Sequence, residues 1–545
     1  MEYYDILLII LQIVFSGVLF WLGGFAEKRK NPKWRVCYLV PVIITLIIMA
    51  MNGFEINMLG AYTGSAVCLA GFIKESVKIR RISSVIAAVL AAVSIPVCLL
   101  SGSYRIYDYA KDFKNGFDHM KKYYVLSEHK GIDWDGLYNE FLPRFEEVNR
   151  LQDEMENTIV WTEFCARFND GHVGFVPSGD YELTMTEMYD KVLGNDYGFA
   201  PMTLSDGRTV AVNVGVDTEA YNAGIRNGTV ITGWDGVAPE NIDDEAMKYF
   251  TFADKDNKEF YRTLICGGTG GDSITVTFLD ESGNEKSAVL QKIGAYYSGR
   301  MKDAMKAVNG GIETGHLMWE EIDENTSALR LKMMMSDSKS MKSDNYDSLS
   351  WSIESQIEEM KEAGKNHIIL DMRDNAGGSD EMVKAIASIF ASEGEHYYCT
   401  DPVWDYMKKC YVTDENGNFV KGTDNYYTGR QLWDGKVTIL VNANSVSAAD
   451  HTVLVMKELE NVTIMGFTEP NGSAQGVGTV VFRNEAGVSF SGSLLLDKNG
   501  KPSVDSGDDY ESGNDVDVIV PFDEDAIRVI FDEGGDYLLQ KALEY

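Results

Sequence analysis

Two stretches decide the fold of this chain: 368-IILDMRDNAGG-378 and 437-VTILVNANSVSAAD-450. Each opens with an unbroken apolar run of strand length and ends in a polar turn, and a helix-forming stretch over residues 448–459 follows the second turn. Unbroken apolar strands that alternate with helices are typical of a sheet whose two faces are both covered. We therefore expect an α/β core over residues 296–545.

The two segments before this core have different patterns. Residues 105–190 alternate aromatic and charged positions at helical spacing, and Asp133 before Trp134 is typical of a helix N-cap. Residues 191–295 contain short alternating stretches such as VAVNV and ITVTF between glycine-containing turns. This pattern predicts a helical N-terminal region followed by a β-rich domain.

Nearly every long apolar run lies before residue 104. Four runs have about the length that crosses a ~30 Å hydrocarbon core: 4–25, 36–51, 58–73 and 82–100. The third is short and rich in glycine, which packed membrane helices tolerate. The first alone has the character of a cleaved signal peptide, but three further runs argue against that explanation. We expect residues 1–104 to form an α-helical anchor of four transmembrane spans.

Charges beside these runs predict the orientation of the chain. The connection over residues 52–57 has no basic residue, whereas nine basic residues follow the first and third runs: Lys28, Arg29, Lys30, Lys33, Arg35, Lys74, Lys78, Arg80 and Arg81. The positive-inside rule places these two basic loops in the cytoplasm. If all four runs insert, everything after residue 101 lies outside the cytoplasm. The sequence thus predicts a multi-pass protein of the cell membrane with an α/β ectodomain.

The composition limits the partners of the chain. Its formal net charge is −34, from 49 Lys and Arg against 83 Asp and Glu. A polyphosphate ligand would be repelled, so we expect no nucleic acid partner. The seven cysteines show neither a CxxC pair nor zinc spacing, so we expect no metal and no cofactor. A disulfide between Cys399 and Cys410 stays an open alternative.

Three segments contain groups suited to acyl transfer. Ser447 stands at a strand-to-helix turn, where a hydroxyl is exposed beside a helix N-terminus. Gly377 and Gly378 would let main-chain N–H groups approach a developing oxyanion, and His172 would supply a base. Each feature also has a plainer explanation, as a helix N-cap, a turn or a packed histidine. His451, one helical turn beyond the serine, is a second candidate base.

These segments, in this order, resemble those of the C-terminal processing peptidases and their tricorn-type relatives. DGHV at 170–173 is similar to the family's Asp-Gly-His segment, IILDMRDNAGG to its Asp-Leu-Arg-x-Asn-x-Gly-Gly turn, and NANSVSAAD to its nucleophile turn. The resemblance covers most of residues 105–545. It implies a Clp-protease/crotonase-like core, Ser447 rather than Ser445 as nucleophile, and an oxyanion hole formed by Ala448 with Gly377 or Gly378.

The β-rich domain is similar to the PDZ module that these enzymes carry. The resemblance rests on YGFAP at 197–201 and AYNAGIRNGTVITGWDGV at 220–237. It implies that Tyr197, Gly198 and Phe199 begin the loop that binds a peptide carboxylate. The module would then capture the C-terminal tail of a polypeptide by strand addition.

One departure from the family selects between its branches. The processing branch uses a Ser–Lys dyad, but no lysine occurs between Lys457 and Lys498, where that lysine would stand. Tricorn-type relatives use Ser, His and Glu, so the resemblance implies His172 as base. Their glutamate is matched by Glu511 in ESGNDVD, although Val516 replaces a proline of the pattern and three aspartates share the loop: Asp505, Asp508 and Asp509.

The resemblance implies a serine endopeptidase that uses Ser447, His172 and Glu511. Together with the apolar runs and their flanking charges, it predicts a membrane-anchored enzyme that hydrolyses extracytoplasmic polypeptides. Two other functions stay open. One is a catalytically inactive, PDZ-bearing receptor that binds peptides, and the other is a small-molecule binder on the same fold. In each case the partners are a polypeptide or small ligand and the lipid bilayer.

Overall fold

The computed structural model describes most of the chain beyond residue 107: residues 108–311, 317–335, 347–505 and 514–545, with scattered positions between 39 and 89. The chain divides into two compact units, Met1–Tyr107 and Asp108–Tyr545. The four predicted membrane spans lie almost wholly outside the described residues. Within the described residues, no helix combines the length and the apolar character needed to cross a bilayer.

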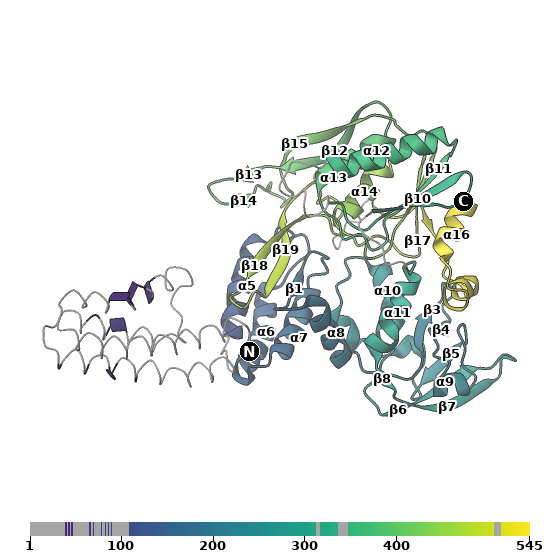
Figure 1. The fold of residues 1–545 in the computed structure, drawn as a ribbon, viewed down its shortest axis with the longest axis horizontal. Helices are drawn as coiled ribbons and strands as arrows, with labels where there is room; N and C mark the ends of the chain where they lie inside the picture. The colour runs from purple at the N-terminus through teal and green to yellow at the C-terminus, as the bar shows by residue number, and fades with distance from the viewer. Residues whose placement is uncertain are drawn as a thin grey trace. The chain divides into compact units, whose positions relative to one another are not determined.

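The second unit begins with helices α5 (Tyr109–Tyr123), α6 (Trp134–Leu151), α7 (Glu154–Ala166) and α8 (Tyr181–Val192) (Figure 1). Each starts at an aspartate whose carboxylate accepts a main-chain N–H of the first turn: Asp108, Asp133, Asp153 and Asp180. The N-cap predicted at Asp133 is confirmed. Aromatic rings fill the space between α5, α6 and α7, where Phe113 stacks on Phe145 with ring centroids 4.3 Å apart.

A β-rich segment follows. It contains β2 (Asn195–Asp196), β3 (Ala200–Thr203), β4 (Thr209–Val212), α9 (Glu219–Asn222), β5 (Ile231–Trp234), α10 (Lys255–Ile265), β6 (Ser273–Leu279), β7 (Glu285–Gln291) and β8 (Gly294–Ala295). Strands β5, β6 and β7 form one antiparallel sheet, while β3 with β4 and β2 with β8 form two-stranded ladders. The strands are short, as their alternating pattern predicts, and they pack around α10. Helix α11 (Lys302–Val308) leads from this segment into the core.

The core is a six-stranded sheet in the order β20-β17-β16-β11-β10-β9. Its strands are β9 (Leu317–Glu321), β10 (Thr326–Leu331), β11 (His367–Asp371), β16 (Lys436–Leu440), β17 (Val462–Gly466) and β20 (Val518–Ile519). Only β9 runs antiparallel to its neighbour; the other described pairs are parallel. The predicted α/β core is present, and β11 and β16 lie side by side in register from His367 with Lys436 to Asp371 with Leu440.

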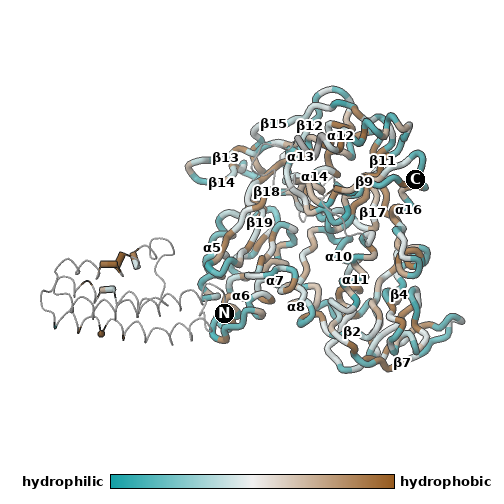
Figure 2. The backbone as a smooth tube through the Cα atoms, viewed as in Figure 1, coloured by the Kyte–Doolittle hydropathy of each residue, from teal (hydrophilic) through white to brown (hydrophobic). Residues whose placement is uncertain are grey.

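Both faces of the sheet are covered, which explains its unbroken apolar strands. On one face, Ile368 and Leu370 pack with α12 (Asp347–Glu362), α13 (Asp380–Phe390) and α14 (Ala448–Met456). On the other face, Ile369 packs with α16 (Tyr537–Glu544) and with apolar residues of the β-rich segment. In Figure 2 hydrophobic stretches of the chain, coloured brown, lie among the core strands. The β-rich segment and the core therefore share one hydrophobic cluster.

A long-range pairing ties the start of the second unit to its end. Strand β1 (Gly174–Val176) lies antiparallel to β19 (Gly487–Ser493), which pairs in turn with β18 (Gly476–Val481). Because β1 comes directly after Asp170-Gly171-His172, this sheet fixes that segment against the core. The hairpins β12 (Gly394–Pro402) with β15 (Lys421–Gly429) and β13 (Trp404–Asp405) with β14 (Cys410–Tyr411) extend beyond it.

A buried ion network joins the end of β11 to the C-terminal helix. Arg373, which is 2% exposed, donates hydrogen bonds of 2.6 Å to Asp371 and to Asp536. Burial by itself raises the pKa of Asp371, but Arg373 and Arg330 hold that pKa below its usual value. Removing one partner from such a network leaves a buried charge uncompensated. The network therefore fixes the turn that begins at Arg373.

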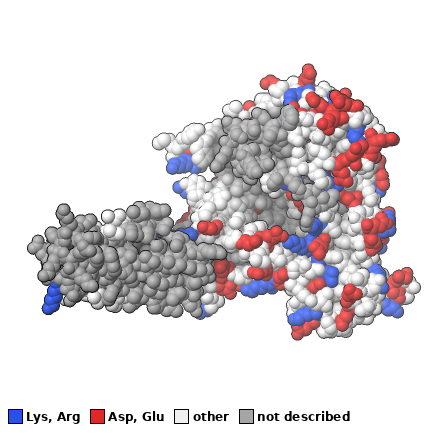
Figure 3. Space-filling view, viewed as in Figure 1, with Lys and Arg blue, Asp and Glu red and all other residues white. Residues whose placement is uncertain are grey.

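Acidic side chains spread over the visible face of the second unit, with basic ones scattered among them (Figure 3).

Cys399 is buried and Cys410 is exposed, and both are free thiols. The alternative of a disulfide between them is therefore wrong for this structure.

Candidate active site

Ser447 occupies a strained turn between β16 and α14. Its φ is +65° and its ψ is −119°, a region that side chains other than glycine rarely adopt. Such a conformation costs about 1–3 kcal/mol and persists only where the surroundings enforce it. Here the main-chain N–H of Ser447 donates to the Ser473 carbonyl at 2.8 Å and to Asp450 Oδ2 at 3.1 Å. The turn thus resembles the sharp elbow on which acyl-transfer nucleophiles are exposed.

The Asp450 side chain stabilises this turn through hydrogen bonds to main-chain N–H groups. Its carboxylate is fully buried and also accepts the N–H groups of Gly472 at 2.9 Å and Ser473 at 3.2 Å. Burial raises the pKa of Asp450 well above its usual value. Sequence reasoning missed this residue, although Ser-x-x-Asp at the start of a helix is a capping-box signal that could have found it.

Ser445 has a different environment from Ser447. Its side chain is fully buried, its hydroxyl donates to the Met372 carbonyl at 2.8 Å, and it accepts the Asn442 N–H at 3.0 Å. Ser447 is only half-buried. The geometry therefore gives Ser445 a structural role and leaves Ser447 as the accessible hydroxyl.

The two glycines after β11 lie against the Ser447 turn. A Cβ atom built on Gly377 would stand 2.5 Å from the Ser447 Cβ, and φ at Gly377 is +79°. The Gly377 N–H donates to Asn375 Oδ1 at 2.9 Å. The N–H groups of Gly378 and Ala448 make no hydrogen bond within the described residues. Those two groups are therefore available to a ligand, whereas Gly377 would first have to release Asn375.

The Asp-Gly-His segment at 170–172 lies close to the Ser447 turn, although the two are far apart in the sequence. The Gly171 N–H donates to Ser473 Oγ at 2.8 Å, so Ser473 contacts both Gly171 and Ser447. Asn471 Oδ1 would lie 2.0 Å from a Cβ atom on Gly171, so any side chain at this position would require the Asn471 side chain to move. The loop over residues 471–473 therefore joins the segment to the nucleophile turn. Sequence reasoning used this loop only to exclude a lysine and missed Ser473.

His172 is buried beside this loop. It is 7% exposed, and within the described residues neither ring nitrogen has a hydrogen-bond partner. Burial lowers its pKa from the usual 6.5, against an opposing effect of Asp170. An unpartnered, neutral imidazole has the properties of a general base. No hydrogen bond links it to Ser447 here, and such bonds often form only when substrate is bound.

Two buried carboxyl groups, those of Asp170 and Asp505, belong to the surroundings of the Asp-Gly-His segment. Asp170 accepts the His172 N–H at 2.9 Å and the Ser491 hydroxyl at 2.7 Å. Asp505 accepts the Ala474 N–H at 3.1 Å, and burial together with the charge of Asp170 raises the pKa of Asp505 to about 7. Glu511, the predicted third residue, lies outside the described residues, as do Asp508 and Asp509.

His451 is held elsewhere. It is fully buried, its Nδ1 lies 3.0 Å from the Tyr398 hydroxyl, and its Nε2 lies 3.4 Å from the Ser503 hydroxyl. The Tyr398 hydroxyl in turn donates to Asp380 at 2.8 Å. These partners engage both ring nitrogens and favour a structural role for His451.

The predicted peptide-binding residues lie between β2 and β3. Tyr197 is buried, and its hydroxyl contacts Thr269 Oγ1 at 2.9 Å. Gly198 has φ +99°, and its carbonyl accepts the Gly215 N–H at 2.9 Å. Phe199 is 7% exposed and belongs to the hydrophobic cluster of the β-rich segment. These contacts fix the loop, and its role in binding stays a prediction.

Comparison with known proteins identifies the core. Residues 329–508 match peptidase family S41, a span that contains both glycines and Ser447. No curated protein matches the chain. Solved structures with a similar fold include mature CPAF complexed with lactacystin, at 14% identity and TM-score 0.47, covering 80% of this chain and 99% of that one.

Two further structures are similar over a comparable length. A putative peptidase from Parabacteroides merdae has 15% identity and TM-score 0.41, covering 80% of this chain and 96% of that one. The photosystem II D1 C-terminal processing protease has 14% identity and TM-score 0.32, covering 79% and 100%. The match over residues 329–508 shows a region of the chain that is similar to peptidase family S41, and it indicates a serine peptidase.

Proposed function

We propose that this serine peptidase is a membrane-anchored endopeptidase that cleaves extracytoplasmic polypeptides with Ser447 as nucleophile and His172 as base. One observation carries the proposal. Ser447 is forced into a positive-φ turn against Gly377, and Ser473 connects that turn to the segment that bears His172. Strain of this kind clusters at functional sites because it preorganises a reacting group.

In the proposed mechanism His172 accepts the proton of the Ser447 hydroxyl while the serine oxygen attacks the peptide carbonyl carbon. The carbonyl oxygen becomes an oxyanion that accepts hydrogen bonds from the N–H groups of Ala448 and Gly378. The imidazolium then gives its proton to the leaving amine, and water, activated by the same histidine, hydrolyses the acyl-enzyme. Each oxyanion donor is expected to contribute about 3–4 kcal/mol to the transition state.

Glu511 completes the triad in this proposal by orienting the imidazole. The support is the absence of lysine between Lys457 and Lys498, which excludes a Ser–Lys dyad, together with two unpartnered ring nitrogens on His172. One nitrogen would face the serine and the other the carboxylate. Gly377 remains an alternative oxyanion donor if substrate displaces its Asn375 contact.

The rest of the chain would deliver substrate. In this proposal residues 191–295 form the PDZ-like domain, which captures a C-terminal or unfolded tail through the loop at Tyr197, Gly198 and Phe199. Remote binding of this kind supports catalysis on long substrates. Deleting the domain should therefore slow cleavage of long polypeptides more than cleavage of short peptides. Equal loss on both would count against a tethering role.

The anchor would hold the catalytic region outside the cytoplasm. The support is the charge pattern of residues 1–104, whose nine basic residues gather in two loops. A reporter fused after Lys78 should then signal from the cytoplasm, whereas one fused at the C-terminus should not. A cytoplasmic signal from the C-terminal fusion would contradict this orientation.

Hydrolysis of an unfolded polypeptide by the full-length chain tests the proposal. Wild-type protein should cleave it, Ser447→Ala should lose activity by several orders of magnitude, and Ser445→Ala should lose far less. An inactive receptor or a small-molecule binder would show no Ser447-dependent cleavage at all. Activity that survives in Ser447→Ala would overturn the assignment of the nucleophile.

A further inference from the structure

Two cavities in the second unit share a wall. The larger has a volume of about 480 Å³ and the smaller about 200 Å³, and both are lined by Phe250 and Phe252. These two residues belong to the connection between the β-rich strands and α10.

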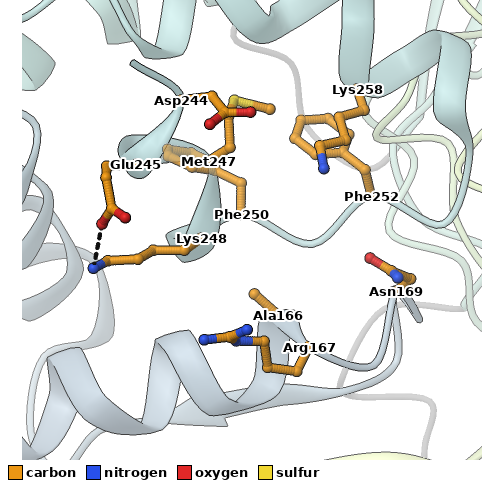
Figure 4. A pocket seen from close by; sticks show the side chains of 10 residues that line it. All are labelled: Ala166, Arg167, Asn169, Asp244, Glu245, Met247, Lys248, Phe250, Phe252 and Lys258. Carbon is orange, nitrogen blue, oxygen red and sulfur yellow. Dashed lines mark hydrogen bonds and ion pairs between the residues drawn. The ribbon is translucent and has the colours of Figure 1, made fainter. Parts of the chain in front are cut away.

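The larger cavity begins beside the Asp-Gly-His segment. Ala166, Arg167 and Asn169 line it from the end of α7, and Asn169 directly precedes Asp170. Figure 4 shows Phe252 and Lys258 facing these residues from the opposite side. The cavity therefore runs from the neighbourhood of the proposed base toward the β-rich segment.

The smaller cavity reaches the nucleophile loop. Ala443, Asn444 and Asn471 line it, and Asn444 is exposed to solvent three residues before Ser447. The Asn471 N–H donates to the Ser445 carbonyl at 3.0 Å, and Asn471 Oδ1 packs against Gly171. One wall of this cavity is thus built from the loop that holds both catalytic segments.

The other walls of the smaller cavity are aromatic. Tyr189 stands with its ring centroid 4.9 Å from that of Phe250 and 4.8 Å from that of Tyr297, and Tyr261 and Met305 also line the cavity. An apolar cavity of about 150 Å³ in another protein holds one benzene ring. A space of this size lined by rings is suited to one aromatic side chain, because rings pack edge-to-face and offset with added stabilisation.

Two asparagine side chains also line this cavity. Asn257, which is 1% exposed, donates through Nδ2 to the Pro470 carbonyl at 2.8 Å, and Asn471 donates through Nδ2 to the Ala443 carbonyl at 3.0 Å. A carbonyl only accepts, so these bonds fix the orientation of both amides. The Oδ1 of each has no partner within the described residues. Because both oxygens are also shielded from solvent, these side chains act as fixed walls of the cavity.

We propose that the smaller cavity is a specificity pocket that receives an aromatic side chain of the polypeptide next to the bond that is cleaved. The larger cavity then carries the chain onward past Phe250 and Phe252. This inference rests on the proposed function, since it assigns the substrate class of the same site. An acidic side chain is disfavoured because entering a space walled by aromatic rings would strip its carboxylate of water without an opposite charge to compensate.

Cleavage of a matched peptide set by the full-length chain tests the pocket. Internally quenched Gly-Ser peptides would carry Phe, Leu, Ala or Asp at one variable position, with the cleaved bond located by mass spectrometry. We expect cleavage beside the variable residue and kcat/KM about 10- to 100-fold higher for Phe than for Ala, with Asp lowest. Equal rates for Phe and Ala would overturn the proposal.

Filling the pocket gives a sharper test. Met305→Trp should lower kcat/KM more for the Phe peptide than for the Ala peptide, so that the ratio of the two values approaches one. Asp303→Trp, an equally bulky change at an exposed position of the same helix, should keep the wild-type ratio. A Met305→Trp protein that retains the full preference for Phe would contradict the assignment.

A binding measurement separates failure of the pocket from failure of the proposed function. The Ser447→Ala protein should bind the Phe peptide at least about tenfold more tightly than the Ala peptide, and adding Met305→Trp should remove the difference. If wild-type protein cleaves nothing but this difference persists, the pocket stands and the peptidase mechanism fails. If cleavage occurs and neither assay shows a preference for Phe, the pocket alone is wrong.

Discussion

The main-chain N–H of Ser447 donates a hydrogen bond of 2.8 Å to the carbonyl oxygen of Ser473. The side-chain hydroxyl of Ser473 also accepts a hydrogen bond of 2.8 Å from the Gly171 N–H. A single residue, fully buried, therefore sets the position of the nucleophile turn relative to the segment that bears His172. Its two roles are separable, because the first uses the main chain and the second uses the hydroxyl.

Ser473→Ala should remove only the contact with Gly171. It leaves that N–H without its acceptor, at a cost of about 1–3 kcal/mol in stability, and loosens His172. We expect kcat/KM to fall about 10- to 100-fold, since small misplacements of a catalytic group have effects of that size. Ser489→Ala is the matched control, because its hydroxyl contacts Gly174 in the adjoining strand at 3.3 Å. Equal effects of the two substitutions on activity would contradict the bridging role of Ser473.

Gly377→Ala should abolish peptide hydrolysis. Its Cβ would stand 2.5 Å from the Ser447 Cβ, so the nucleophile turn must move. Gly283→Ala separates this effect from backbone strain, because Gly283 has φ +78° but open space where its Cβ would lie. Both variants carry the strain of a left-handed alanine, about 1–2 kcal/mol, and only the first should lose activity. Hydrolysis assays with thermal unfolding of both proteins check this, and an active Gly377→Ala would refute the contact.

The acidic limb of kcat/KM should lie below pH 6.5. A general base must be unprotonated, and burial lowers the pKa of His172, so activity should persist to a lower pH than a solvent-exposed histidine would allow. Asp170 opposes that shift. Asp170→Asn should therefore move the limb to still lower pH. A limb well above pH 7 in wild-type protein, or an upward shift in Asp170→Asn, would contradict this environment for the base.

His451→Ala should act on stability instead. Its ring is fully buried between the hydroxyls of Tyr398 and Ser503, so truncation leaves a cavity and removes one hydrogen-bond partner from each hydroxyl. We expect a loss of about 2–4 kcal/mol in the free energy of unfolding, measured with urea. The folded fraction should keep most of its activity and its acidic limb, whereas His172→Ala should lose activity with little loss of stability. The opposite pattern would make His451 the base.

Local signals in the sequence were sufficient for the α/β core, whereas the choice of Ser447 as nucleophile depended on the family resemblance. The apolar runs before Arg373 and Asn442 predict buried strands, and β11 and β16 are such strands, lying beside one another in the sheet. Asp133 was a readable N-cap because capping depends on residues three apart. These features require only short-range patterns, which a single sequence displays.

The remainder depends on pairings between distant residues. Gly174 pairs with Ser489 in a strand of only three residues, which carries no periodic signal. The hydroxyl of Ser473 accepts a hydrogen bond from Gly171, which is 302 residues away in the sequence. The stretch GSAQ at 472–475 by itself indicates only a turn. The aromatic pocket likewise draws on α8, α10, α11 and the nucleophile loop. No spacing rule in the sequence connects such segments.

The most direct test of the central claim is the site of covalent labelling by a fluorophosphonate, mapped by peptide mass spectrometry on the full-length chain. Only a serine activated by a neighbouring base reacts quickly with such a probe. We predict one adduct, on Ser447, that is absent in Ser447→Ala, strongly slowed in His172→Ala and unaffected in Asp303→Trp. An adduct on another residue, no adduct at all, or full-rate labelling in His172→Ala would contradict the assignment of Ser447 and His172.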